Sequence, residues 1–172
     1  MDTNHIRGRA HVFGDNINTD LISPAQYMEK SRQEIAAHAM EGADADFVRR
    51  MKPGDIVVAG DNFGSGSSRE TAPAALKDCG VSVVIARFFA RIFYRNCMNI
   101  GLPALICPET GRIDEQDELE IDLMNGRVYD VTKGIELTCE PLPPHMMELL
   151  KSGGLMEWLL TRKKEDEPCI RK

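Results

Sequence analysis

The feature that most constrains the fold is a regular alternation of strand-like and helix-like segments in the middle of the chain. Three apolar segments of strand length lie at residues 55–60, 81–86 and 102–106. Helix-like segments separate them at 71–79 and at about 88–98, and Gly80 stands where the first of these helices would end. Consecutive strands joined by crossover helices pair in parallel, so we expect an α/β fold around parallel strands.

The N-terminal third adds a strand and two short helices. Residues 7–13 predict a first strand, and a loop rich in side-chain oxygens follows at 18–24. Apolar residues at helical spacing predict a helix around 35–40. A second helix is predicted over 44–51, since Pro53-Gly54 would stop it.

An antiparallel part follows the parallel part. From Glu118 the sequence alternates around Asn125-Gly126, a dipeptide typical of a type I′ hairpin turn. Residues 128–131 and 135–138 continue this part as two further strands. We therefore expect a mixed sheet.

The length and the C-terminal pattern favour one domain. A chain of 172 residues buries enough surface to fold without a disulfide or a metal. A closing helix is predicted from Pro143-Pro144, with an interruption at 152–154 and a last helical segment over 155–160. We expect a single domain over residues 1–161 and a charged, solvated C-terminal tail over 162–172.

Charge, hydropathy and cysteines exclude several classes of protein. The net charge of −6 argues against nucleic-acid binding, which needs a basic surface. No apolar run reaches the ~20 residues of a membrane span, and the N-terminus lacks the pattern of a signal peptide. The five cysteines are far apart and form no Cys-x-x-Cys pair. We expect buried, reduced thiols of a cytoplasmic protein, and no disulfide framework or metal site on this chain.

One loop is not explained by packing. Gly64-Ser65-Gly66-Ser67-Ser68-Arg69-Glu70 lies between a predicted buried strand and the start of a helix. Glycines allow close backbone approach, the first amides of a helix lack intrahelical acceptors, and Arg69 is a bidentate donor for a carboxylate or a phosphate. An anion or substrate site is one interpretation. The others are a Ser67-x-x-Glu70 capping box without chemistry and a flexible linker.

Other known loop motifs do not fit this segment. It lacks the lysine of a P-loop, the spaced glycine of a Gly-x-Ser-x-Gly nucleophile elbow and the third glycine of a dinucleotide-binding loop. A Ser-His-Asp triad has no support either, because the histidines are scattered. We expect surface or hydrogen-bonded histidines at His5, His11, His38 and His145.

Four segments point to a family by their residues, order and spacing. They are Gly-Asp-Asn-Ile-Asn-Thr-Asp-Leu-Ile-Ser-Pro-Ala at 14–25, the loop at 64–70, Ala-Arg-Ile-Phe-Tyr-Arg-Asn at 90–96 and Asn-Ile-Gly-Leu-Pro at 99–103. From about Gly8 to Trp158 the chain resembles the small subunits of 3-isopropylmalate dehydratase, the detached counterpart of the swivelling C-terminal domain of aconitase. The resemblance implies a three-layer β/β/α swivelling domain with a mixed sheet.

The resemblance also implies a reaction. Enzymes of this family are hydro-lyases that isomerise a hydroxy acid by removing water and adding it back the other way round. Their [4Fe-4S] cluster lies on the large subunit and acts on the departing hydroxyl. We therefore expect no cofactor on this chain, a large partner subunit, a hydroxy-dicarboxylate substrate, and activity only in the pair.

The family motifs assign roles to individual residues. Ser67 would be the base that takes the proton from the carbon next to a carboxylate, and Arg69 would bind a substrate carboxylate. Asp20 would orient the serine and the arginine. The further substrate-binding candidates are Thr19, Gly66 and Ser68.

The substrate itself is less constrained. The segment expected to govern specificity has neither the apolar pattern typical for isopropylmalate nor the arginine typical for homoaconitate; it comprises Tyr27, Met28, Glu29 and Lys30. Isopropylmalate, in leucine biosynthesis, is the first expectation. Homoaconitate, citraconate or citramalate, and 2,3-dimethylmalate are the alternatives, as is a non-enzymatic carboxylate-binding module. Self-association of the isolated chain stays open, and Thr71 stands where many relatives have His or Gln, which would alter a contact near the motif.

Overall fold

The computed structural model describes residues 5–68 and 70–166, with side chains as far as Lys163. Seven strands form one mixed sheet in the order β4-β3-β2-β1-β5-β6-β7. The strands are β1 (His5–Val12), β2 (Ile56–Ala59), β3 (Val83–Ala86), β4 (Ala104–Ile106), β5 (Glu118–Asp122), β6 (Arg127–Asp130) and β7 (Ile135–Thr138). The helices are α1 (Thr19–Ile22), α2 (Arg32–Ala37), α3 (Phe47–Arg50), α4 (Thr71–Cys79), α5 (Arg91–Asn99), α6 (Pro144–Ser152) and α7 (Leu155–Asp166), with short 3₁₀ helices η1 (Ala25–Tyr27) and η2 (Thr110–Arg112).

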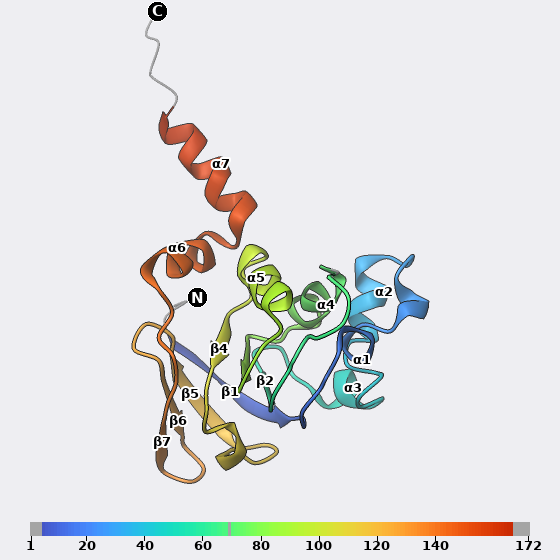
Figure 1. The fold of residues 1–172 in the computed structure, drawn as a ribbon, viewed down its shortest axis with the longest axis vertical. Helices are drawn as coiled ribbons and strands as arrows, with labels where there is room; N and C mark the ends of the chain where they lie inside the picture. The colour runs from blue at the N-terminus through green and yellow to red at the C-terminus, as the bar shows by residue number, and fades with distance from the viewer. Residues whose placement is uncertain (1–4, 69, 167–172) are drawn as a thin grey trace, which may run out of the picture.

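Strand β1 joins a parallel half of the sheet to an antiparallel half. Its residues 10–12 pair in parallel with β2, whereas residues 5–9 pair antiparallel with β5. Strands β2, β3 and β4 continue in parallel, and β5, β6 and β7 continue antiparallel. In Figure 1, β1 runs diagonally between the two halves. The predicted mixed α/β fold is confirmed.

The two ends of the sheet approach each other. The backbone N–H of Glu140, just after β7, donates to the carbonyl of Ile106 at the end of β4, at 2.8 Å. The sheet is therefore curled, and its antiparallel and parallel halves form two β layers. Helices α1 to α5 gather on the side of the parallel half, as Figure 1 shows. This is the predicted three-layer β/β/α arrangement.

The parallel strands form the centre of the core. All four residues of β2 and all four of β3 are buried. Strands covered on both faces need apolar side chains at consecutive positions, which explains their continuous β-branched sequence. Helix α4 covers them with Ala72 and Leu76, and ends at Gly80, which has the positive φ of 107° expected at that position.

Three local predictions need correction. The segment 18–24 was expected to be a loop, but it contains the single-turn helix α1, capped by the Asn18 side chain. Helix α5 begins at Arg91 and not near Phe88, because residues 88–90 pair with the main chain of Phe63. The hairpin at Asn125-Gly126 exists, but its loop has four residues and only Gly126 has a positive φ, so the turn is not type I′.

The C-terminal region forms two helices. Pro144 occupies the first turn of α6, and the interruption predicted at 152–154 separates α6 from α7. Helix α7 projects away from the body of the molecule (Figure 1). It extends to Asp166, so residues 162–166 of the predicted tail continue a helix, and residues 167–172 lie outside the described residues.

A buried hydrogen bond between two side chains fixes β1 against the start of β2. His11 is 1% exposed, and its Nε2 lies 3.0 Å from Oδ2 of Asp55. The Asp55 carboxylate also accepts the backbone N–H groups of Lys52 and Arg9. Burial alone raises the pKa of Asp55, but these three hydrogen bonds outweigh burial and hold the pKa below its ordinary value. The carboxylate therefore stabilises the fold in its ionised form.

Replacing Asp55 by Asn should destabilise the protein by about 1–3 kcal/mol at pH 7, because buried donors lose their charged acceptor. A carboxylate with a lowered folded pKa stabilises above its unfolded pKa, near 3.9, and loses that contribution as the pH falls through the folded value. The difference between wild type and Asp55→Asn should therefore shrink below about pH 4. Urea unfolding at pH 7 and pH 3 measures it, with the exposed Glu29→Gln as control. An equal difference at both pH values would contradict the assignment.

Candidate active site

The loop at 64–68 is joined to the segment before α1 by three hydrogen bonds. The N–H of Gly64 donates to the carbonyl of Ile17 at 2.7 Å, and the N–H of Thr19 donates to the carbonyl of Ser65 at 2.8 Å. The N–H of Ser67 donates to Oγ1 of Thr19 at 3.1 Å. Two segments almost fifty positions apart thus form one surface, as the family motifs imply.

Helix α1 places Asp20 beside this loop. The Asn18 side chain caps α1 by accepting the N–H groups of Asp20 and Leu21, at 3.0 and 2.9 Å. Asn18 also forms an isolated parallel bridge with Ser65. Asp20 is exposed on the first turn of this helix. In the Asn-Thr-Asp sequence, Thr19 therefore binds the serine loop. Asn18 caps the helix turn on whose surface the Asp20 carboxylate lies.

Helix α5 supports the same loop from below. The buried Asn96 donates its side-chain amide to the carbonyl of Ser68 at 3.2 Å. Gly64, with a φ of 78°, lies so close to Phe93 that a Cβ at position 64 would be 2.1 Å from its ring. The predicted segment 90–96 is thus packed under the loop. Asn96 belongs to the family segment 90–96, but no role was predicted for it from the sequence.

Ser67 lies on the surface of this assembly. It is half-buried, between the exposed Gly66 and Ser68. Its backbone N–H donates to the hydroxyl of Thr19, a residue that is 3% exposed. Thr19, predicted to bind substrate, therefore contacts the main chain of the predicted base.

The capping-box interpretation is wrong. Helix α4 begins at Thr71 with Glu70 as its N-cap residue, and the Glu70 side chain makes no capping hydrogen bond with the described residues. Ser67 lies three positions before that N-cap residue. The amides of Thr71 and Ala72 in the first turn consequently keep their capacity to bind an anion, whereas the amide of Ser67 does not. Arg69 lies outside the described residues, so the structure adds nothing about its guanidinium.

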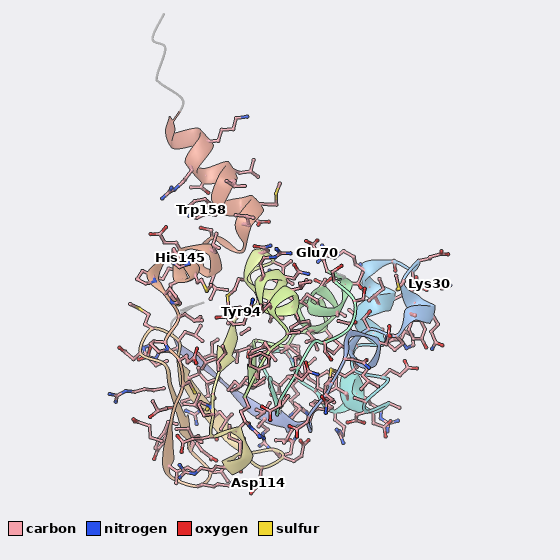
Figure 2. The ribbon with its side chains drawn as sticks, viewed as in Figure 1. Lys30, Glu70, Tyr94, Asp114, His145 and Trp158 are labelled. Atoms are coloured by element: carbon pink, nitrogen blue, oxygen red, sulfur yellow. The ribbon has the colours of Figure 1, made fainter. Side chains whose placement is uncertain are left out.

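The predicted specificity residues are not gathered at the loop. Tyr27 stacks on His38, with ring centroids 3.8 Å apart, and its hydroxyl donates to Glu41 at 3.1 Å. Glu29 and Lys30 are exposed, and Met28 is 37% exposed. Figure 2 shows Lys30 at the outer edge of the molecule, well to one side of Glu70.

Another polar group of the segment 14–25 is the hydroxyl of Ser23. The Ser23 hydroxyl is buried at the C-cap of α1 and makes no hydrogen bond within the part of the chain that the structure describes. Sequence reasoning assigned Ser23 no role, although it belongs to the quoted segment 14–25.

The histidines and cysteines behave as structural residues. His11 and His38 are bound to carboxylates, and His5 and His145 are exposed, as predicted. Cys97, Cys107 and Cys139 are buried; burial raises the pKa of Cys97, and that of the partly buried Cys79 to about 11. Cys169 lies outside the described residues. Among the residues described, no three His, Cys, Asp or Glu side chains are grouped to hold a metal ion, and no helix is long and apolar enough to cross a membrane.

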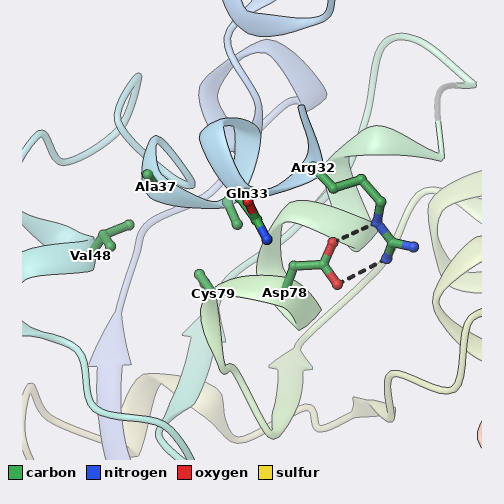
Figure 3. Close-up of a pocket in the computed structure, with 7 residues that line it drawn as sticks. Arg32, Gln33, Ala37, Val48, Asp78 and Cys79 are labelled. Atoms are coloured by element: carbon green, nitrogen blue, oxygen red, sulfur yellow. Dashed lines mark hydrogen bonds and ion pairs between the residues drawn. The ribbon is translucent and has the colours of Figure 1, made fainter. Parts of the chain in front are cut away.

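One pocket lies away from the serine loop. It has a volume of about 520 Å³ and lies between α2, α3 and α4 (Figure 3). Arg32 borders it and binds Asp78 through two hydrogen bonds of 2.9 Å. A smaller pocket of about 260 Å³ reaches the motif through Glu70 and Thr71. Neither of these two pockets includes Ser67, which is half-buried between two exposed neighbours.

Comparison with known proteins shows the family to which the chain belongs. The aconitase C-terminal domain family matches residues 10–110. The 3-isopropylmalate dehydratase small subunit of Thermodesulfovibrio yellowstonii is 51% identical over 159 residues, covering 91% of this chain and 95% of its own length. The isopropylmalate/citramalate isomerase small subunit of Methanocaldococcus jannaschii is 48% identical over 164 residues, covering 94% and 98%.

A solved structure agrees with the sequence relatives. The crystal structure of 3-isopropylmalate dehydratase from Methanocaldococcus jannaschii superposes with a TM-score of 0.90 at 44% identity, over 94% of this chain and 96% of that one. Fold and family match together define the class, an aconitase-type C-terminal domain. Within that class, the chain belongs to the family of 3-isopropylmalate dehydratase small subunits.

Proposed function

We propose that this chain is the small subunit of a two-chain hydro-lyase that interconverts 2-isopropylmalate and 3-isopropylmalate in leucine biosynthesis. The observation that carries the proposal is the hydrogen bond of 3.1 Å from the Ser67 amide to the Thr19 hydroxyl, which joins two family motifs at one open surface. The names of the close relatives support the same activity. A cytoplasmic location fits a biosynthetic enzyme of this kind.

Ser67 is the proposed base. Its oxygen takes the proton from the carbon next to a carboxylate, and the electron pair of that C–H bond forms the carbon–carbon double bond as hydroxide leaves the neighbouring carbon. The proton then returns to the carbon that lost hydroxide, and hydroxide adds to the carbon that lost the proton, which gives the isomer. Asp20 and Arg69 are the proposed orienting and carboxylate-binding residues.

A serine needs help to act as a base, because its alkoxide carries a full negative charge. The uncapped first turn of α4 supplies the amides of Thr71 and Ala72, and a guanidinium at Arg69 would add a positive charge. These groups act strongly only where water is excluded. The open position of Ser67 therefore supports a site that is complete only when a second protein covers it.

The second protein in the proposal is the large subunit that the relatives' names imply. In this proposal the large subunit holds a [4Fe-4S] cluster, which would supply a Lewis acid for the departing hydroxyl. This chain contributes the base, the carboxylate contacts and the surface that closes over the substrate.

Citramalate is the second candidate substrate. The relative from Methanocaldococcus jannaschii carries both substrates in its name and aligns over 94% of this chain. Citramalate bears a methyl group where isopropylmalate bears an isopropyl group, so one pocket could accept both by size. A carboxylate-binding module without catalysis is a third possibility that the same experiment addresses.

The test is a substrate panel on the pair reconstituted anaerobically with the cognate large subunit. Activity on isopropylmalate, with or without citramalate, supports the proposal. Activity on homoaconitate or 2,3-dimethylmalate alone would replace it. Calorimetric binding of these acids by the isolated chain, together with an inactive pair, would favour a carboxylate-binding module.

Thr19 should act as a positioning residue for Ser67. Thr19→Val keeps the shape but removes the acceptor of the Ser67 amide, and an unpaired amide costs about 1–3 kcal/mol. We expect kcat to fall roughly 10- to 100-fold if that cost appears in the transition state, while KM changes less. Thr19→Ser, which keeps the hydroxyl, should restore most of the rate. Steady-state kinetics of the pair measure both, and a rise in KM alone would return Thr19 to substrate binding.

A further inference from the structure

The outer face of α5, together with Phe88 three positions before the helix, carries exposed apolar and basic side chains. Phe88 is 56% exposed and Ile92 is 44% exposed. Arg91 and Arg95 are exposed on the same face of the helix, one turn apart. We call Phe88, Arg91, Ile92 and Arg95 the α5 patch. Large apolar side chains and arginines together are the composition that protein interfaces favour.

The α5 patch is rigidly connected to the candidate site. The inner face of the same helix holds the serine loop through Phe93 and Asn96. Just before the helix, the N–H of Phe63 donates to the carbonyl of Phe88, and the N–H of Ala90 donates to the carbonyl of Phe63. A protein bound to the patch would therefore contact the helix whose opposite face holds the serine loop.

The charges of the α5 patch are unfavourable in the isolated chain. Arg91 is the first residue of α5, where the helix dipole favours an acidic side chain, and the first turn contains none. Arg95 follows at the i, i+4 spacing, where like charges repel. Within the described residues, neither arginine has an ion-pair partner, whereas Arg87 just before Phe88 pairs with Asp61 at 3.0 Å. The chain has 27 acidic residues against 21 basic ones, so a shortage of carboxylates does not explain why these two arginines are unpaired.

We propose that the α5 patch is the docking surface for the large subunit, whose facing surface offers carboxylates to Arg91 and Arg95 and an apolar socket to Phe88 and Ile92. This rests on the proposed function, in which a second protein closes the site. A second copy of this chain fits less well. A symmetric contact centred on the patch would place the arginines of the two copies against each other. The two copies as a whole would also repel, because each has a net charge of −6.

The first experiment measures the affinity of the pair. Activity is titrated by adding wild-type or variant small subunit to a fixed amount of large subunit. Phe88→Ala should raise the dissociation constant at least tenfold, with activity at saturation within about twofold of wild type. The matched control is Tyr129→Ala, which removes an exposed aromatic side chain from β6 in the antiparallel half and should leave the dissociation constant unchanged.

The second experiment separates docking from folding by the sign of its two effects. Arg91→Glu places a favourable charge at the start of α5 and an attractive i, i+4 pair with Arg95. The isolated variant should melt about 1–4 °C higher than wild type, since both new electrostatic interactions stabilise the helix. Its pair with the large subunit should nevertheless dissociate at least tenfold more readily, and Arg127→Ala serves as the control.

The results that would overturn the proposal are specific. Unchanged dissociation constants for both Phe88→Ala and Arg91→Glu would remove the patch from the interface. Conversion of an isolated oligomer to monomers, without an effect on pairing, would assign the patch to self-association. A pair that forms normally but is inactive on every acid of the panel would refute the proposed function while leaving the docking result intact.

Discussion

Replacing Ser67 with Ala is expected to reduce kcat of the reconstituted pair by about 10²- to 10⁴-fold, the range typical of losing a positioned general base. KM should change little, because the hydroxyl is not the proposed carboxylate contact. Steady-state kinetics with isopropylmalate measure the loss. Exchange of the substrate's carbon-bound hydrogen with solvent, followed in deuterium oxide, reports the proton-transfer step itself and should be lost in parallel.

Stability measurements distinguish this role from a structural one. If Ser67 capped a helix, its replacement would cost about 1 kcal/mol of stability. Because α4 has Glu70 as its N-cap residue, Ser67→Ala should melt at the wild-type temperature. Ser68→Ala is the matched control for the loop and should retain far more activity. More than a tenth of wild-type activity in Ser67→Ala would exclude Ser67 as the base.

The fold was predictable where a pattern had one physical explanation. Strands β2 and β3 are buried on both faces, so their continuous β-branched sequence had no plausible helical alternative of that length. Helix α4 was predicted with its observed bounds because Gly80 marks its end by backbone conformation. The start of α5 was missed because Phe88 and Phe89 continue the apolar spacing of a helix, whereas their backbone pairs with a loop distant in sequence.

The site was predictable in its residues but not in its contacts. The capping box at Ser67 and Glu70 is a local rule, and taken alone it would start the helix three residues before the predicted and observed start at Thr71. The sequence held a signal against it. Pro73 lacks a backbone N–H and fits only the first turn of a helix, which requires a start near Thr71. The bond between Ser67 and Thr19 had no such signal, because it depends on how the β1 and β2 ends meet.

Replacing Gly64 with Ala is expected to cost about 2–6 kcal/mol of stability. The residue has a φ of 78°, and a left-handed conformation at a non-glycine residue costs about 1–3 kcal/mol. The new Cβ would also lie 2.1 Å from the ring of Phe93. That ring is fixed by edge-on contact with Phe63, at 5.3 Å between centroids, and overpacking of this kind costs a further 1–3 kcal/mol or so.

The effect should reach the chemistry because Gly64 begins the serine loop. Thermal unfolding should shift down by roughly 4–20 °C, and any folded Gly64→Ala should lose activity in the pair, since Ser67 moves with the loop. Gly14→Ala is the matched control: its Cβ would meet nothing within 4 Å, so its stability should stay within about 0.5 kcal/mol of wild type. In a Phe93→Ala background the cost of Gly64→Ala should be smaller, because that change removes Cγ and Cδ2 of Phe93, which lie 2.1 and 2.5 Å from the added Cβ. Equal costs in both backgrounds would mean that backbone strain alone, and not packing against α5, requires glycine at this position.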